Sequence, residues 1–79
     1  MANNDKVIIN KFINVFWKWI RNTETPAQSD NEGWSAFCDS ASRAVKAFEG
    51  EYMVSESLHW LFIKWMNDYL EYAGKENAV

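Results

Sequence analysis

Large apolar side chains recur every three or four residues along most of this chain, and that spacing is the feature that most constrains its fold. An α-helix turns through about 100° per residue, so side chains at these spacings share one helical face. The three glycines and single proline fall mostly between the periodic segments. We therefore predict an all-α fold, a three-helix up-down-up bundle with helices at about 4–22, 30–49 and 54–73.

The first segment has an apolar face and a polar face. Its apolar residues fill one arc of about 160° on a helical wheel and are predicted to face the core. They are Ile8, Ile9, Phe12, Ile13, Val15, Phe16, Trp19 and Ile20. Lys18 and Arg21 lie on the opposite side, where Trp17 is the one large apolar residue. The helix is expected to stop before Pro26, because the residue preceding proline resists the helical conformation.

The second segment carries signals for both of its ends. Ser29 and Glu32 match the S-x-x-E capping box, in which the two side chains satisfy free backbone amides at a helix start. Ser29 is therefore predicted to be the N-cap, and Gly50 to supply the left-handed residue that ends the helix. Cys38 falls within the apolar stripe and is predicted to be a small core residue.

The third segment has more apolar surface than one interface needs. Ser55 is predicted to cap its start and Gly74 to end it. Between them the apolar arc spans about 200°, so this helix either lies between the other two or contacts something outside the monomer. Trp60 projects from its polar side.

Length and composition indicate one small domain over residues 1–79, with frayed ends at 1–3 and 75–79. Five tryptophans supply an aromatic-rich core. A single cysteine excludes an internal disulfide and favours a reducing compartment. Without an apolar stretch of about 20 residues, we expect no membrane span and a cytoplasmic location. The net charge of −3 disfavours a general nucleic-acid binder.

Residues for catalysis or metal binding are scarce. His59 is the only histidine and Cys38 the only cysteine, so a zinc site of the usual Cys/His type lacks ligands. A Cys38–His59 nucleophile and base pair is disfavoured, because a thiol buried in apolar surroundings is inert. His59 is expected to make a boundary contact. We predict no catalytic, metal-binding or cofactor-binding residue, no small-molecule substrate and no enzymatic activity.

The surplus of apolar surface favours a protein-interaction module. Exposed tryptophan is enriched at the energetic centres of interfaces, which makes Trp17 and Trp60 the first candidates for a contact. Ile63, Lys18 and Arg21 are grouped with them as partner-binding residues. The partner is predicted to be another protein or a second copy of this chain in a homodimer.

The residue pattern of three short stretches resembles that of other small proteins. They are Phe16-Trp17-Lys18-Trp19-Ile20, Asn31-Glu32-Gly33-Trp34 and Asp68-Tyr69-Leu70-Glu71. In these the chain resembles the short uncharacterised helical proteins of phages and mobile elements, although Gly33 departs from the helix-favouring residue expected before Trp34. The resemblance implies a phage or mobile-element association but brings no functional residues. Phage proteins of this size recurrently bind and block a host enzyme, CRISPR nucleases included.

Two alternative functions stay open. In the first, the protein is a phage-encoded, anti-CRISPR-like inhibitor of a host defence nuclease, and an acidic surface occupies the nucleic-acid channel. That surface would comprise Asp30, Glu32, Asp39, Glu49 and Glu51. In the second, the protein is a weak DNA-binding accessory that uses Lys11, Lys18 and Arg21 of the first helix.

Overall fold

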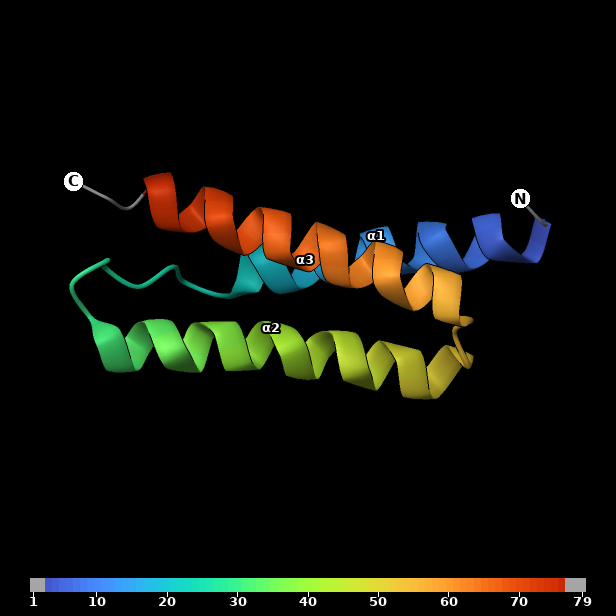
Figure 1. Ribbon diagram of the computed structural model, residues 1–79, viewed down its shortest axis with the longest axis horizontal. Coiled ribbons are helices and arrows are strands. Elements are labelled where there is room, and N and C mark those ends of the chain that lie inside the picture. The colour runs from blue at the N-terminus through green and yellow to red at the C-terminus, as the bar shows by residue number, and fades with distance from the viewer. Residues whose placement is uncertain (1–2, 77–79) are drawn as a thin grey trace.

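The computed structural model describes residues 3–76 and contains α1 (Asn3–Asn22), α2 (Asn31–Tyr52) and α3 (Glu56–Glu76). Successive helices run antiparallel, so α1 and α3 are parallel and α2 packs against both (Figure 1). No strand occurs among residues 3–76. The predicted all-α, three-helix bundle is confirmed. Of the predicted frayed ends, residues 1–2 and 77–79 lie outside the described residues, whereas Asn3, Lys75 and Glu76 are helical.

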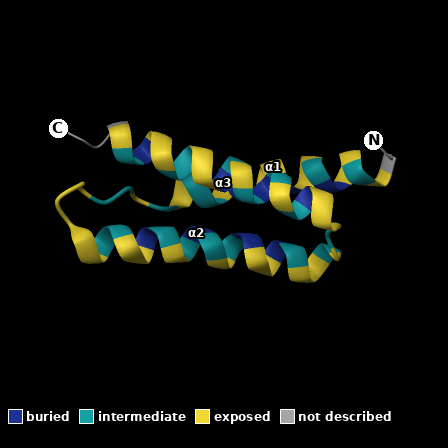
Figure 2. Cartoon of the chain, in the orientation of Figure 1, coloured by how far each residue is buried: buried dark blue, intermediate teal, exposed yellow. Residues whose placement is uncertain are grey.

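One phenylalanine from each helix meets at the centre of the core. Phe12 of α1 stacks on Phe62 of α3 with ring centroids 3.9 Å apart. Phe48 of α2 meets both rings edge-on, at 5.3 and 5.7 Å. Smaller apolar residues extend this contact along the bundle, and the buried positions alternate with exposed ones along each helix (Figure 2). The remaining buried members of the cluster are Ile8, Phe16, Ala41, Val45, Leu58 and Met66.

The buried face of α1 is narrower than its apolar arc. Ile13 and Val15, at the two edges of the arc, are 49% and 42% exposed, so their predicted place in the core is wrong. Each helix of a three-helix bundle contacts only two neighbours, which cover an apolar stripe of roughly 100°. Tyr72, at one edge of the arc of α3, is 60% exposed for the same reason. The sequence therefore contains more apolar surface than the bundle covers.

The N-cap of α2 is Asp30 rather than Ser29. The Asp30 carboxylate accepts a hydrogen bond from the backbone N–H of Gly33 at 2.9 Å, and its carbonyl accepts one from Trp34. The prediction of Ser29 was wrong by one residue, because serine and aspartate are both good caps and adjacent here. At the start of α3, by contrast, the predicted cap is confirmed, since Ser55 Oγ accepts from the Leu58 N–H at 3.3 Å.

Alanine substitutions distinguish between Asp30 and Ser29 as the N-cap of α2. Asp30→Ala is expected to lower the free energy of unfolding by about 1 kcal/mol, because it removes the acceptor of an otherwise unpaired helix N–H. Ser29→Ala is expected to change it by no more than about 0.5 kcal/mol. Urea unfolding followed by circular dichroism measures both. A larger loss for the serine variant would contradict the assignment of Asp30.

Neither Gly50 nor Gly74 ends its helix, in contrast to the prediction for each. The chain stays helical through Gly50 to Tyr52, and Met53 takes the left-handed conformation with φ 50° and ψ 58°. Tyr52 packs on Phe48 with ring centroids 4.6 Å apart, and this burial extends α2 beyond the glycine. Gly74 lies within α3 against Trp34, where a Cβ would come 3.2 Å from the indole ring. Its small size serves close packing of α2 on α3.

Two glycines of α2 are expected to respond to alanine with opposite signs. A Cβ at Gly50 would meet nothing within 4 Å, so Gly50→Ala should stabilise the protein by about 0.5–1 kcal/mol through helix propensity. A Cβ at Gly33 would lie 2.2 Å from an Asp30 carboxylate oxygen, so Gly33→Ala should displace the cap and destabilise the protein. Urea unfolding of both variants checks this. Changes in the free energy of unfolding that have the same sign in both variants would contradict the surroundings of the two glycines.

Candidate functional site

The two tryptophans that fall outside the apolar arcs of their helices are exposed. The accessible fraction is 55% for Trp17 and 60% for Trp60. Trp19, by contrast, donates its indole N–H to Ser40 Oγ at 3.0 Å and stacks on Phe16, so its polar atom and its ring are both engaged within the bundle. The two exposed indoles are therefore the natural starting points for a contact surface.

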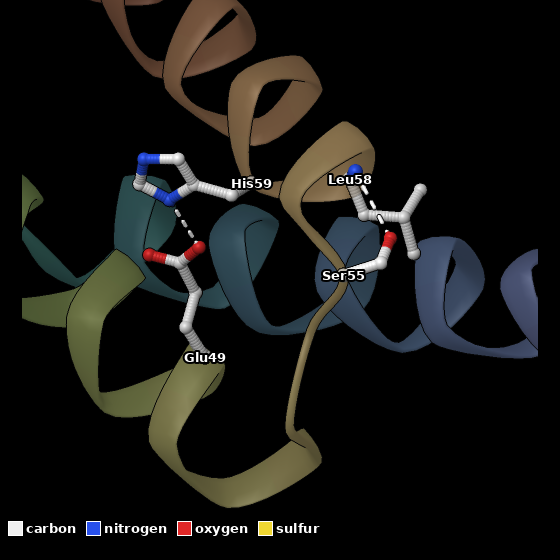
Figure 3. A network of polar contacts seen from close by, with 4 residues as sticks. All are labelled: Glu49, Ser55, Leu58 and His59. Carbon is white, nitrogen blue, oxygen red and sulfur yellow. Dashed lines mark hydrogen bonds and ion pairs between the residues drawn. The ribbon is translucent and has the colours of Figure 1, made fainter.

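Trp60 lies on the outer flank of α3 nearer to α2, about 100° around the helix from His59. Its ring contacts the imidazole of His59, with centroids 4.9 Å apart. His59 Nδ1 in turn pairs with a carboxylate oxygen of Glu49 on α2, across the α2–α3 turn (Figure 3). Ile63, one turn after Trp60, is partly buried and packs against the core. His59 therefore makes the boundary contact expected of it, with Trp60 beside it.

Trp17 lies on the opposite flank, where α1 adjoins α3. Among the ring contacts with other helices in residues 3–76, Trp19 meets Phe37 of α2 as well as Tyr69 of α3, whereas Phe16 meets Tyr69 of α3 alone. At about 100° per residue, Ile13 and Trp17 are roughly 60° and 100° beyond Phe16, on the side away from Trp19. Both therefore border the line along which α1 meets α3. The structure does not bring Trp17 and Trp60 together.

Tyr72 approaches the same line from α3. Its ring contacts Tyr69, with centroids 6.4 Å apart, and Tyr69 contacts both Phe16 and Trp19 of α1. Tyr72 is turned about 60° from Tyr69, away from the side of α3 that meets α2. The surface formed along this line is called the α1–α3 face below. It comprises the exposed Ile13, Trp17 and Tyr72 with the partly buried Ile9, Leu61 and Trp65.

The exposed cations of α1 differ from those of the other helices. Within residues 3–76, Lys6, Lys11, Lys18 and Arg21 form no ion pair; Lys11 instead lies 5.4 Å from the centre of the Tyr52 ring. Three of the four cations of α2 and α3 pair with a carboxylate four residues away, at 2.8–3.5 Å, and Lys46 is the exception. These pairs are Arg43–Asp39, Lys64–Asp68 and Lys75–Glu71. Unpaired positive charge is thus concentrated on α1.

The five candidate acidic residues do not form one acidic surface. Asp30 is occupied as the cap of α2, Glu49 pairs with His59, and Asp39 pairs with Arg43. Glu32 is exposed on the outer side of α2, and Glu51 lies about 100° from it around the helix, toward α1. The outer face of α2 therefore carries both signs of charge, with Glu32 and Asp39 followed by Arg43 and Lys46.

Cys38 and His59 are far apart. Cys38 lies eleven residues before Glu49, the partner of His59, on the same straight helix, a distance of about 16 Å along its axis. The thiol is partly exposed rather than buried in the core, which corrects its predicted environment. The structure therefore does not assemble the nucleophile and base pair considered above.

A cavity of about 420 Å³ lies between the α1–α2 linker and the start of α2. Its lining residues are Thr23, Glu24, Thr25, Pro26, Asp30, Gly33, Ala36, Phe37 and Ser40. Of these, Asp30 caps α2 and Ser40 accepts from Trp19, so both side chains have structural partners. Residues 3–76 contain no group of three His, Cys, Asp or Glu side chains placed to hold a metal ion. No helix in the described part of the chain combines the length and apolar character that crossing a membrane requires.

Comparisons with protein-family models, with curated proteins and with solved structures gave no match for this chain. The case for a function therefore depends on the geometry of the chain itself, and the α1–α3 face is its most distinctive surface.

Proposed function

We propose that the protein is a small helical binding module, without enzymatic activity of its own, that recognises another protein through the α1–α3 face. The observation that supports this most directly is the exposure of Ile13, Trp17 and Tyr72, at 49%, 55% and 60%, which helical phase assigns to the same side of the bundle. Scattered apolar residues are ordinary on protein surfaces, but adjacent large ones mark interaction sites. Trp17 is the expected centre of the contact.

The energetic gain from covering this face is substantial. If Trp17 leaves about 100 Å² of apolar area in water, its burial on a partner would contribute roughly 2–3 kcal/mol. Ile13 and Tyr72 would add smaller amounts. The aromatic rings beneath, Trp65 and Tyr69, are held by the core, so the face is already ordered before binding. A preformed surface avoids part of the entropic cost of association.

Photo-crosslinking tests this function in the cell. A photoreactive phenylalanine derivative placed at Trp17 or Tyr72 is expected to form a discrete adduct with one protein. The matched control is the same residue at Lys46, an exposed position on the outer side of α2 that borders no other helix. A third position, Trp60, shows whether the α2 side of α3 takes part as well.

The positions from which adducts form show whether the proposal holds. Adducts from positions 17 and 72 but not from position 46 support it, and an adduct with the mass of two chains identifies self-association. Adducts of equal yield from all positions, or none from positions 17 and 72, would refute the α1–α3 face as a protein-binding surface.

The inhibitor hypothesis has weaker geometric support. It needs a continuous acidic surface to mimic nucleic acid. Three of its five residues are engaged in a cap or an ion pair, and Arg43 lies among them. An inhibitor that uses the α1–α3 face instead would be one form of the binding module proposed here.

A further inference from the structure

We infer that the occupant of the α1–α3 face is an amphipathic helix of a partner protein, with acidic residues along the flank that meets α1. This inference rests on the proposed function and gives its partner a chemical class. The charge pattern beside the face, the parallel course of α1 and α3, and the mixture of aliphatic and aromatic side chains each point to it.

The positive charge beside the face favours a negatively charged partner. Lys6 and Arg21 lie within about 40° of Trp17 around α1, Arg21 one turn after it and Lys6 about three turns before it, at the two ends of the face. Neither forms an ion pair within the described chain. On the α3 side of the face, Lys64 and Asp68 neutralise each other at 2.8 Å. The rim is therefore positive on α1 and neutral on α3. A complementary ligand is acidic where it meets α1.

A second copy of the chain does not supply that charge. In a two-fold dimer that pairs α1 with α1, the cations of the two copies face each other, which opposes association. In one that pairs α1 with α3, Lys6 and Arg21 meet a rim whose exposed acids already have lysine partners. A different protein therefore fits this face better than a copy of the same chain does.

The shape of the face suits a helix. Phe12 contacts Trp65 and Phe16 contacts Tyr69, so the two parallel helices advance in step. The apolar residues of the face run from Ile9 to Trp17 on α1 and from Leu61 to Tyr72 on α3, a length of about 12–17 Å. A helix of which about two to three turns lie along this line would complete a four-helix bundle, which buries the apolar stripe of each member.

The aliphatic side chain in the face separates this occupant from nucleic acid. Trp17 and the cations alone are compatible with a base stacked on the indole and phosphates beside it. Ile13, half exposed next to Trp17, gains nothing from phosphate or sugar but is buried by a leucine or isoleucine of a partner helix. An anionic lipid surface is also negatively charged, but it does not have the elongated shape with which a helix fills a groove. Anionic vesicles are therefore included in the test as a competing ligand.

A displayed library of amphipathic helices tests the inference. Each member is an 18-residue helix with an apolar stripe of varied Leu, Ile and Phe, and with Glu, Gln or Lys allowed at every flanking position. Selection against the immobilised full chain is expected to enrich Glu over Lys on one flank. The best clones, measured as free peptides, should bind Trp17→Ala about thirty-fold more weakly.

Charge reversal provides the matched comparison. Lys6→Glu with Arg21→Glu is expected to weaken the selected acidic helices about ten-fold or more. Arg43→Glu with Lys46→Glu makes the same change of net charge on α2 and should leave binding within about two-fold. Circular dichroism of both double variants establishes that they are folded before their binding is compared.

Several results would overturn the inference. They are enrichment of neutral or basic helices, binding that is indifferent to Trp17→Ala, and tighter Trp17-dependent binding of a DNA duplex or of phosphatidylglycerol vesicles than of any helix. In each case adducts from positions 17 and 72 with a protein would still uphold the binding module, so the two proposals fail separately.

Discussion

Phe62→Ala is expected to lower the free energy of unfolding by about 3–5 kcal/mol, the largest effect of any substitution considered for this chain. Phe62 has no exposed surface, stacks on Phe12 at 3.9 Å and meets Phe48 edge-on, so alanine would leave a cavity bordered by all three helices. Small domains have total stabilities of roughly 5–15 kcal/mol. Urea unfolding followed by circular dichroism should show an unfolding midpoint at a much lower urea concentration, or a variant that is not folded even without urea.

The matched control is Trp60→Ala on the same helix. Trp60 is 60% exposed, and its ring contact is with the partly buried His59, so its removal should change the free energy of unfolding by no more than about 0.5 kcal/mol. Similar losses for the two variants would mean that the described helical phase of α3 is wrong.

Ala41→Leu is expected to destabilise the protein by about 1–3 kcal/mol through overpacking. Ala41 has no exposed surface and lies on α2 one turn from both Phe37 and Val45, which are buried as well. Three extra carbon atoms there would force neighbouring rings out of their present packing. Thermal and urea unfolding measure the loss.

Ala47→Leu is the control for this substitution. Ala47 lies on α2 but is exposed, and alanine and leucine have similar helix propensities, so the stability should barely change. A stabilising effect of Ala41→Leu would show that space exists beside Ala41, contrary to the packing described here.

Periodicity was sufficient to predict the helices but not their ends. The apolar spacing around Phe12, Phe48 and Phe62 requires three amphipathic helices, and the bundle has them. Glycine was a poor guide to termination, because Gly50 and Gly74 both lie within helices. After Gly50, Tyr52 packs against the core, and Gly74 itself packs against Trp34 of α2. Tertiary packing outweighs the cost of about 1 kcal/mol for a glycine in a helix.

The sequence alone predicted only part of the candidate surface. Helical phase placed Trp17 and Trp60 outside the apolar arcs but left open their exposure, which the structure shows for both. It did not reveal that they lie on different flanks, since a wheel of one helix carries no information on where its neighbours pack. The contribution of Ile13 and Tyr72 was hidden for a related reason. Both lie within apolar arcs, and only the placement of α1 against α3 leaves them uncovered.

The most direct test of the central claim is the solvent accessibility of the indole N–H groups, measured by nuclear magnetic resonance with a soluble paramagnetic agent. In the protein alone, the signals of Trp17 and Trp60 should broaden strongly, while that of Trp19, bonded to Ser40, should persist. Addition of the partner captured through position 17 should then restore the Trp17 signal and leave Trp60 broadened. A Trp17 signal that is protected in the protein alone, or that stays broadened in the complex, would contradict the assignment of the α1–α3 face as the binding surface.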